Sequence, residues 1–311
     1  MFTKTNILLL IFLTSHLSAA NIDKLPSWID PWRDATISIG KLDSMDVSQK
    51  DGKVKKVIFF SIVGTGVLMG LPNDSLGIPV LVTAKHIFYD PILNWEPESL
   101  LLRFSWFDDR PVDKYYGIKI LLKKDNKRMW FAHPDTTIDL ACIPLRISKK
   151  EIQNDSAQPI PFGNFATRED FFEGASIAVL GYPGAVGPYY WSKSLIRQGI
   201  IAWLTPQKPE QNSFLVDCNL FPGNSGGPVF KIPAGMDRMG NFVLGNVAFL
   251  GIVSKGPKQL LPTFIGNKEL QIITGSDTAK VVSQSFIGIG VIESSFRIRD
   301  LLTEAAKYYK R

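Results

Sequence analysis

Histidine and cysteine are scarce in this sequence, with only three histidines and two cysteines among 311 residues. Two cysteines allow at most one disulfide bond, and Cys142 and Cys218 lie in different halves of the chain. Neither cysteine lies in a segment that favours a turn, so we expect two buried free thiols and no cysteine nucleophile. We also predict that the protein has no metal site and needs no cofactor.

A strong charge bias is also missing. The formal net charge is +6 at pH 7, and the basic residues are spread along the chain. The two densest basic clusters, residues 53–56 and 123–128, are typical of solvated hairpin turns. A nucleic-acid-binding surface would instead combine basic residues with aromatic ones on one face. We therefore predict no nucleic-acid partner.

Residues 7–17 form an apolar run that is too short to span a membrane. Lys4 precedes the run, and the small residues Ser18, Ala19 and Ala20 follow it. This order is typical of a secretory signal peptide cleaved after Ala20. We expect a secreted or periplasmic protein with no stable membrane span after cleavage.

From residue 35 onward the sequence consists of short apolar or alternating segments separated by turn residues, which favours an all-β sandwich or barrel. Strands are predicted at 35–42, 57–70, 78–84, 99–107, 116–122, 128–133, 139–145, 175–181, 195–204, 213–218, 227–232, 242–254 and 286–292. Near the C-terminus, Ile298, Leu301, Leu302 and Ala305 recur at helical spacing, and Ser294 or Ser295 is suited to cap that helix.

The segment that organises the sequence is the turn at residues 222–228, Pro-Gly-Asn-Ser-Gly-Gly-Pro. An exposed Ser225 in such a turn can attack a carbonyl carbon, and the N–H groups of Gly223 and Ser225 can bind the resulting oxyanion. The alternative is a glycine-rich turn that contains a serine by chance. The pattern also fits the elbow of α/β-hydrolases, but that triad needs a histidine after the serine, and none follows Ser225.

A triad in the order His, Asp, Ser can be completed. His86 ends the apolar run at 81–86, and Asp139 stands near the start of the buried-looking strand at 138–145. A carboxylate in such a strand is costly unless it is hydrogen-bonded, and an imidazole N–H would satisfy it. His133 begins a turn, and we expect it to be structural or exposed.

Three segments together resemble the signature segments of chymotrypsin-fold serine peptidases: Thr83-Ala84-Lys85-His86, Asp139-Leu140-Ala141 and Gly223-Asn224-Ser225-Gly226-Gly227. The likeness is closest to the bacterial branch that includes the Deg-type proteases, and it covers roughly residues 55–305. It implies two packed six-stranded antiparallel β-barrels followed by a C-terminal α-helix. It also implies a polypeptide substrate. Deg-type proteins usually carry a peptide-binding PDZ domain after this helix, and here we expect none, so their oligomeric, regulated behaviour is not carried over.

The resemblance gives each residue a role. His86 is the general base, Asp139 orients it, Ser225 is the nucleophile, and the N–H groups of Gly223 and Ser225 form the oxyanion hole. Asn224 replaces the aspartate with which digestive enzymes anchor a new N-terminus, so we expect activity without internal cleavage before Ile62.

Along the chain, the residue pattern predicts a signal peptide at 1–20 and an N-terminal arm at 21–34, and the resemblance implies a first barrel at 35–150. An inter-barrel crossing follows at 151–172, and the second barrel with its helix occupies 173–311. The excursion at 257–285 is either a lid or specificity loop or an unrelated hairpin.

Substrate-binding residues are predicted on the segments that wall the pocket in this fold. Asn219 occupies the position where trypsin-type enzymes carry a carboxylate, so a basic preference is not indicated. Apolar neighbours, including Ile289 and Val291, favour an apolar residue before the cut, while Lys255 could recruit an acidic one. The predicted contacts are Asn219, Leu220, Phe221, Ser254, Lys255 and Gly256.

These observations favour an exported serine endopeptidase. Two alternatives stay open: a catalytically silent relative that binds peptides, and an esterase of the same fold.

Overall fold

The structure is a computed structural model that describes residues 27–48, 53–72, 79–105, 117–145, 158–184, 193–255 and 288–309, with strand backbone also assigned between 258 and 286. The chain divides into two compact units, residues 1–30 and 31–311. Except for the first residue of α2 (Asp30–Asp34), all elements below belong to the second unit. The predicted signal peptide and its cleavage site lie outside the described residues.

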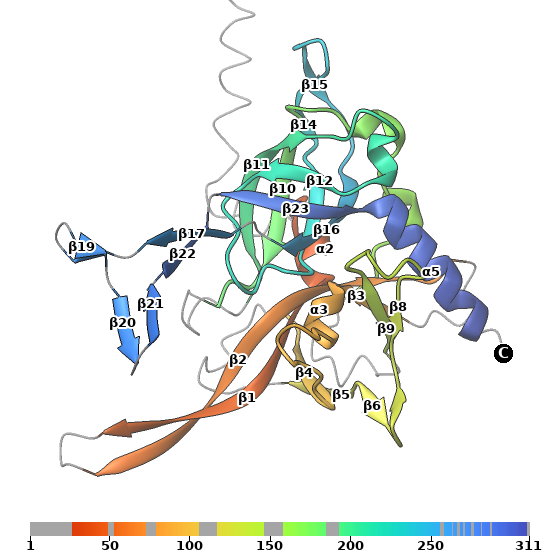
Figure 1. Cartoon of the computed structure of the whole chain (residues 1–311). Coiled ribbons are helices and arrows are strands. Elements are labelled where there is room, and N and C mark those ends of the chain that lie inside the picture. Colours follow the sequence, from red (N-terminus) through yellow and green to blue (C-terminus); the bar gives the residue numbers. More distant parts are fainter. Residues whose placement is uncertain are drawn as a thin grey trace, which may run out of the picture. The chain divides into compact units, whose positions relative to one another are not determined.

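The first half of the second unit contains one seven-stranded sheet with the order β5-β4-β1-β2-β3-β9-β8 (Figure 1). All pairings in it are antiparallel. Its strands are β1 (Thr36–Ser48), β2 (Val54–Met69), β3 (Val80–Thr83), β4 (Ser99–Arg103), β5 (Ile118–Leu121), β8 (Phe131–Ala132) and β9 (Ala141–Pro144). The helix α3 (Lys85–Phe88) follows β3 directly.

The predicted closed first barrel is therefore confirmed only as a sheet. The edge strands β5 and β8 are short, four and two residues, and neither pairs with the other. Residues 128–133 do not form one strand, because β7 (Lys127–Arg128) pairs with β6 (Lys123–Lys124) and β8 pairs with β9. The predicted hairpin turn at 123–128 is confirmed: Asp125 and Asn126 both have positive φ, 50° and 59°, as a two-residue hairpin loop requires.

The second half forms a closed six-stranded barrel with the order β10-β11-β12-β23-β16-β13, as predicted (Figure 1). Its strands are β10 (Ser176–Gly181), β11 (Leu195–Trp203), β12 (Phe214–Asp217), β13 (Pro228–Lys231), β16 (Ala248–Lys255) and β23 (Ile289–Ser294). The predicted strand at 242–254 is instead divided, because β15 (Phe242–Leu244) pairs with β14 (Ala234–Met236) in a separate hairpin.

The interior of this barrel explains why the second half closes. One buried cluster combines inward-facing residues from every barrel strand with aromatic residues before β10. Burying apolar surface in this way supplies the main free energy of folding. The cluster includes Phe171, Ile177, Val179, Ile201, Phe214, Val216, Val229, Leu250, Val253 and Ile292.

The segment between the two halves is anchored to both. It contains the short 3₁₀ helices η2 (Phe162–Asn164) and η3 (Arg168–Asp170). The backbone N–H of Ile160 donates to the carbonyl of Leu68 on β2 at 2.9 Å, and that of Ala166 donates to Phe249 on β16 at 2.9 Å. A third 3₁₀ helix, η5 (Pro209–Gln211), precedes β12.

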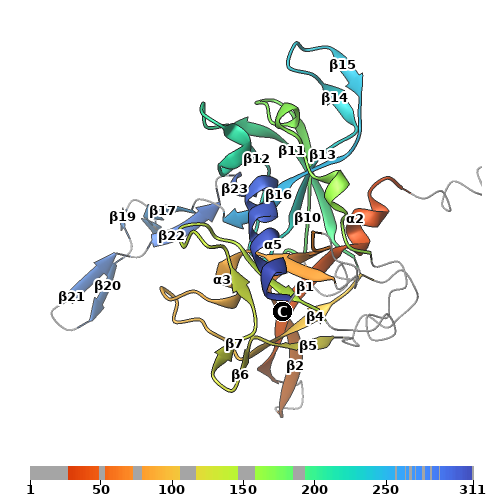
Figure 2. The same cartoon turned by 90° about the vertical axis from the view of Figure 1, so that its right-hand side faces the viewer.

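The C-terminal helix α5 (Ser295–Tyr309) confirms the helical spacing found in the sequence (Figure 2). Ile298, Leu301, Leu302 and Ala305 are all buried. Ser294 is the capping residue, because its hydroxyl oxygen accepts the N–H of Phe296 at 3.1 Å.

Both cysteines are buried free thiols, as expected. Burial raises the pKa of the Cys218 thiol, so it stays protonated at neutral pH. Among the described residues, no helix is long and apolar enough to cross a membrane.

The excursion predicted at 257–285 contains strand backbone in three antiparallel pairs. These pairs join β17 (Lys258–Pro262) with β22 (Val282–Phe286), β18 (Phe264–Ile265) with β19 (Lys268–Glu269), and β20 (Gln271–Thr274) with β21 (Asp277–Lys280). Its side chains and Gly256 lie outside the described residues, so its role as a lid or specificity loop stays a prediction.

Candidate active site

Ser225 lies in the sharp turn between β12 and β13. Gly223 and Gly226 flank it with φ angles of +99° and +84°, a region that glycine adopts far more readily than other residues. A Cβ on Gly226 would overlap the carbonyl oxygen of Thr65, and one on Gly223 would overlap that of Tyr182. The two glycines therefore let the turn approach neighbouring backbone closely, and Ser225 stays half-buried.

The backbone N–H groups of this turn fall into two sets. Those of Asn224, Gly226 and Gly227 donate to protein carbonyl oxygens at 3.0, 2.6 and 2.8 Å. Those of Gly223 and Ser225 have no acceptor within the part of the chain that the structure describes. The two N–H groups predicted to bind an oxyanion are thus the two that the fold leaves available.

His86 lies on α3, three residues after the strand β3 ends at Thr83. The ammonium group of Lys85 donates to the carbonyls of Thr136 and Ile138 at 2.7 and 3.1 Å. The backbone N–H of Lys85 donates to the backbone carbonyl of Asp139 at 3.2 Å. These bonds tie the start of α3 to the segment that carries Asp139. The imidazole of His86 remains about one-third exposed, at 32%.

The Asp139 carboxylate accepts three hydrogen bonds. Its Oδ2 accepts from Nδ1 of His86 at 2.8 Å and from the hydroxyl of Ser254 at 2.7 Å, and its Oδ1 accepts the His86 backbone N–H at 3.0 Å. Burial would raise the pKa of Asp139, but these hydrogen bonds and the charge of His86 outweigh it and lower the pKa below its ordinary value. Asp139 is therefore ionised at neutral pH and holds the Nδ1–H tautomer of His86.

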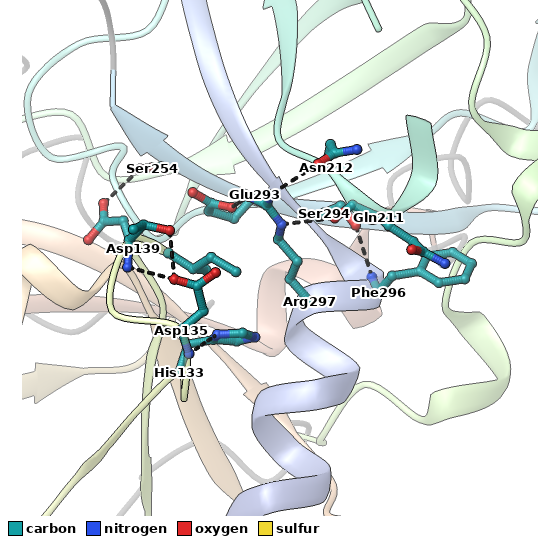
Figure 3. Close-up of polar contacts among 12 residues, drawn as sticks. His133, Asp135, Asp139, Gln211, Asn212, Ser254, Glu293, Ser294, Phe296 and Arg297 are labelled. Atoms are coloured by element: carbon teal, nitrogen blue, oxygen red, sulfur yellow. Dashed lines mark hydrogen bonds and ion pairs between the residues drawn. The ribbon is translucent and has the colours of Figure 1, made fainter. Parts of the chain in front are cut away.

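Residues 133–140 form a compact turn that supports Asp139 (Figure 3). The His133 backbone N–H donates to the carbonyl of Leu140 at 3.0 Å, and its Nδ1 accepts the N–H of Asp135 at 3.1 Å. Asp135 in turn accepts the N–H and hydroxyl of Thr137 at 2.9 and 2.7 Å. Burial lowers the pKa of His133, which favours its neutral form. His133 is half-buried and has the structural place that its turn sequence predicts.

Ser225, His86 and Asp139 line one pocket, so the fold brings the three predicted catalytic residues together. No hydrogen bond joins the Ser225 hydroxyl to His86 among the described residues; such bonds often tighten only when substrate binds. Apolar side chains supply much of the remaining wall. The pocket is lined by Val63, Lys85, His86, Tyr89, Asp90, Pro91, Ile92, Leu93, Asp139, Leu220, Phe221, Pro222, Gly223, Ser225, Val253 and Lys255.

The predicted substrate contacts divide into two groups. Leu220, Phe221 and Lys255 line the pocket. Asn219 and Ser254 do not: the Asn219 carbonyl accepts a hydrogen bond from Arg197 at 2.9 Å, and Ser254 is buried against Asp139. The guanidinium of Arg197 also lies 4.6 Å from the ring centre of Phe221, so it packs against this residue of the pocket wall.

Sequence reasoning missed two further parts of the pocket. Ile92 and Leu93 lie on its rim and are 92% and 75% exposed. Asp90 orders their loop, because its Oδ1 accepts the N–H groups of both residues at 2.9 and 3.2 Å. Asp90-Pro91 signalled a turn, but no feature of the sequence placed that turn beside Ser225. Val63 on β2 also lines the pocket and is the second residue position that was not predicted.

The family of trypsin-like peptidase domains matches residues 64–235, just over half of the chain. The matched region contains His86, Asp139 and Ser225. It ends before β16 and therefore before Ser254 and Lys255. No curated protein matches the chain.

Proposed function

Since the chain belongs to the trypsin-like peptidase family, we propose that it is an exported serine endopeptidase that works through His86, Asp139 and Ser225. One observation supports this most strongly: the three side chains line one pocket, with His86 already hydrogen-bonded to an ionised Asp139. The export part of the proposal rests on the signal-peptide pattern at residues 1–20. The closeness to Deg-type proteases and the closure of the first-half sheet into a barrel remain part of the proposal.

The proposed reaction has two steps. The Ser225 hydroxyl attacks the peptide carbonyl while Nε2 of His86 takes its proton, and the carbonyl oxygen becomes an oxyanion bound by the N–H groups of Gly223 and Ser225. The C–N bond then breaks, and His86 gives its proton to the leaving amine, which leaves an ester on Ser225. Water, deprotonated by His86, hydrolyses that ester and restores the hydroxyl.

Asp139 acts by holding His86. Its Oδ2 fixes the proton on Nδ1, which leaves Nε2 free to accept the serine proton, and its negative charge stabilises the imidazolium that forms. Each oxyanion N–H typically contributes about 10²–10³ in rate.

The pocket supports a preference for an apolar residue before the cleaved bond. Leu220, Phe221 and Val253 line it and offer apolar surface, whereas Lys255 is exposed at its edge. Apolar pockets discriminate by only about 1–3 kcal/mol per methylene group, so the preference should be broad.

A fluorophosphonate probe tests the proposal, since it labels only an activated serine. We expect the wild type to be labelled and to cleave casein. Ser225→Ala should lose both labelling and cleavage while keeping its melting temperature. Ser44→Ala, which changes an exposed serine on β1, is the matched control and should behave as wild type.

The alternatives give different results. An unlabelled wild type would show the silent peptide-binding relative. Labelling with turnover of esters but not of peptides would show the esterase. Cleavage of casein by Ser225→Ala at the wild-type rate would overturn the assignment of the nucleophile.

A further inference from the structure

Thr65 lies on β2 in the first half, is completely buried, and is bonded to the serine turn of the second half. Its backbone N–H donates to the carbonyl of Ser225 at 2.8 Å, and its hydroxyl donates to the carbonyl of Gly223 at 2.6 Å. The same hydroxyl oxygen accepts the N–H of Tyr182 at 3.1 Å. The Thr65 carbonyl accepts the hydroxyl of Thr83 at 2.7 Å. One residue thus holds two of the carbonyls in the turn.

All four consecutive carbonyls from residue 222 to residue 225 accept hydrogen bonds. The carbonyl of Pro222 accepts the N–H of Gly184 at 3.0 Å, and that of Asn224 accepts the N–H of Gly227 at 2.8 Å. Thr65 holds the other two. In a trans peptide the N–H points away from the carbonyl of the same plane. Fixing the carbonyls of Pro222 and Asn224 therefore fixes the directions of the N–H groups of Gly223 and Ser225, while Thr65 fixes the peptide between these two and the peptide after Ser225.

The carbonyl of Gly223 is the weak point of this arrangement. Its described partner is a side-chain hydroxyl, whereas the other three carbonyls accept backbone N–H groups, which only a substitution by proline would remove. Glycine at φ +99° has no Cβ to limit rotation of the peptides on either side of it. The N–H of the peptide that follows Gly223 belongs to Asn224 and donates to the carbonyl of Phe221 at 3.0 Å, so it is not itself an oxyanion donor. This peptide joins the two that carry the oxyanion N–H groups. Without the Thr65 hydroxyl it is held at its N–H alone and can tilt, which changes the angle between the N–H groups of Gly223 and Ser225.

Tyr182 gives the hydroxyl its direction. Because the oxygen of Thr65 accepts the Tyr182 N–H, its own hydrogen is directed to the Gly223 carbonyl. Both partners are buried backbone groups, so losing the hydroxyl leaves a donor and an acceptor unsatisfied.

We propose that the Thr65 hydroxyl is a positioning residue for the oxyanion hole, which it holds in shape from the opposite half of the fold. The inference rests on the proposed function. It predicts that Thr65 acts on the transition state and not on the binding of substrate, since its side chain is buried and lies outside the pocket.

The test compares Thr65→Val, which keeps the shape and removes the hydroxyl, with Thr65→Ser, which keeps the hydroxyl. We expect Thr65→Val to lower kcat about 10²-fold, as removal of one oxyanion donor does, with KM changed less than about threefold. Thr65→Ser should recover kcat to within a few-fold of wild type. Affinity for a peptide boronic acid, which forms a tetrahedral adduct with the serine, should fall in parallel with kcat.

Thr36→Val is the matched control. Thr36 is equally buried, and its hydroxyl donates to the carbonyl of Trp32 at 2.6 Å, away from the serine turn. Thr36→Val loses one buried hydrogen bond and Thr65→Val loses two, so a general effect of destabilisation would lower kcat in both variants in proportion to the loss of melting temperature. If Thr65→Val does not fold, Thr65→Cys replaces it: a thiol is a weak donor, and kcat should fall about 10-fold.

The possible failures are distinguishable. If the wild type is not labelled by a fluorophosphonate, the proposed function fails. If the wild type is labelled but Thr65→Val retains wild-type kcat, or loses no more than Thr36→Val, only the role of Thr65 is overturned. A rise in KM with kcat unchanged would also overturn it.

Discussion

Ser254→Ala removes one of the three hydrogen bonds that hold the Asp139 carboxylate. Ser254 lies on β16, is 1% exposed, and donates at 2.7 Å to the same Oδ2 that accepts Nδ1 of His86. The substitution leaves the two hydrogen bonds from His86 in place. It therefore measures how much the Ser254 hydrogen bond stabilises a carboxylate that is already hydrogen-bonded to His86.

The size of the effect follows from the type of bond. A hydrogen bond to a charged group contributes about 1.5–3 kcal/mol. The Asp139 side chain is 21% exposed, so water replaces part of the lost bond, and we expect a loss of about 1–2 kcal/mol in the free energy of unfolding at pH 7. We expect kcat/KM to fall about 5–10-fold, since a loss of about 1–1.4 kcal/mol in transition-state stabilisation corresponds to that factor.

The loss should depend on pH in a defined direction. The pKa of Asp139 is lowered in the folded protein, so its ionisation stabilises the fold above the unfolded-state pKa of about 3.9. That stabilisation disappears as the pH falls through the folded-state pKa. Without the Ser254 hydroxyl, the folded-state pKa moves back up. The difference between wild type and Ser254→Ala should therefore be full at pH 7 and shrink below about pH 4.

Urea unfolding at several pH values measures this difference. Ser38→Ala is the control, because Ser38 is fully buried and its hydroxyl has no hydrogen-bond partner among the described residues. It should change stability by less than about 0.5 kcal/mol, a typical limit for a substitution that removes no specific interaction. An equal loss for Ser254→Ala at pH 3 and pH 7 would refute the reasoning. So would an undiminished loss when Asp139 has already been replaced by alanine, since a double-mutant cycle isolates the pair.

Two further predictions follow from the geometry of the pocket. Gly226→Ala should lower the free energy of unfolding by several kcal/mol and abolish probe labelling, because the new Cβ would overlap the Thr65 carbonyl and φ is +84°. Thermal melting and fluorophosphonate labelling measure these two effects. A stable, labelled variant contradicts the prediction. The double change Ile92→Ser with Leu93→Ser should lower kcat/KM about 10-fold for peptides with apolar residues beside the cut, while labelling by a small fluorophosphonate is unchanged. Cleavage of a mixed peptide library shows whether the preference is lost, and an unchanged profile contradicts a role for this rim.

The sequence predicted best those features that depend on neighbouring residues. The periodicity of Ile298, Leu301 and Leu302 identified α5 because one helix face repeats locally. The turn residues Asp125 and Asn126 identified a hairpin for the same reason. β1 was predicted too short, since it continues to Ser48 through exposed, partly polar positions whose pairing with β2 has no hydrophobic alternation.

Features that depend on distant residues could not be predicted. Ser254 was predicted in the pocket wall, but its hydroxyl donates to Asp139, 115 positions earlier, at a point where the register of β16 against β23 shifts. Thr65 was not predicted as a site residue, since its partner Gly223 lies 158 positions later. Contacts of this kind are set by the packing of the two halves, and no local pattern encodes them.

The two halves of the fold support each other at the site. Asp139 belongs to the first half and is held by Ser254 of the second, while the serine turn belongs to the second half and is held by Thr65 of the first. Each half thus completes the part of the site that the other half carries. Neither the His86–Asp139 pair nor the serine turn keeps all its hydrogen bonds unless the halves are packed together. Activity and the packing between the halves are therefore coupled, and a substitution that loosens this packing should lower kcat before the protein unfolds.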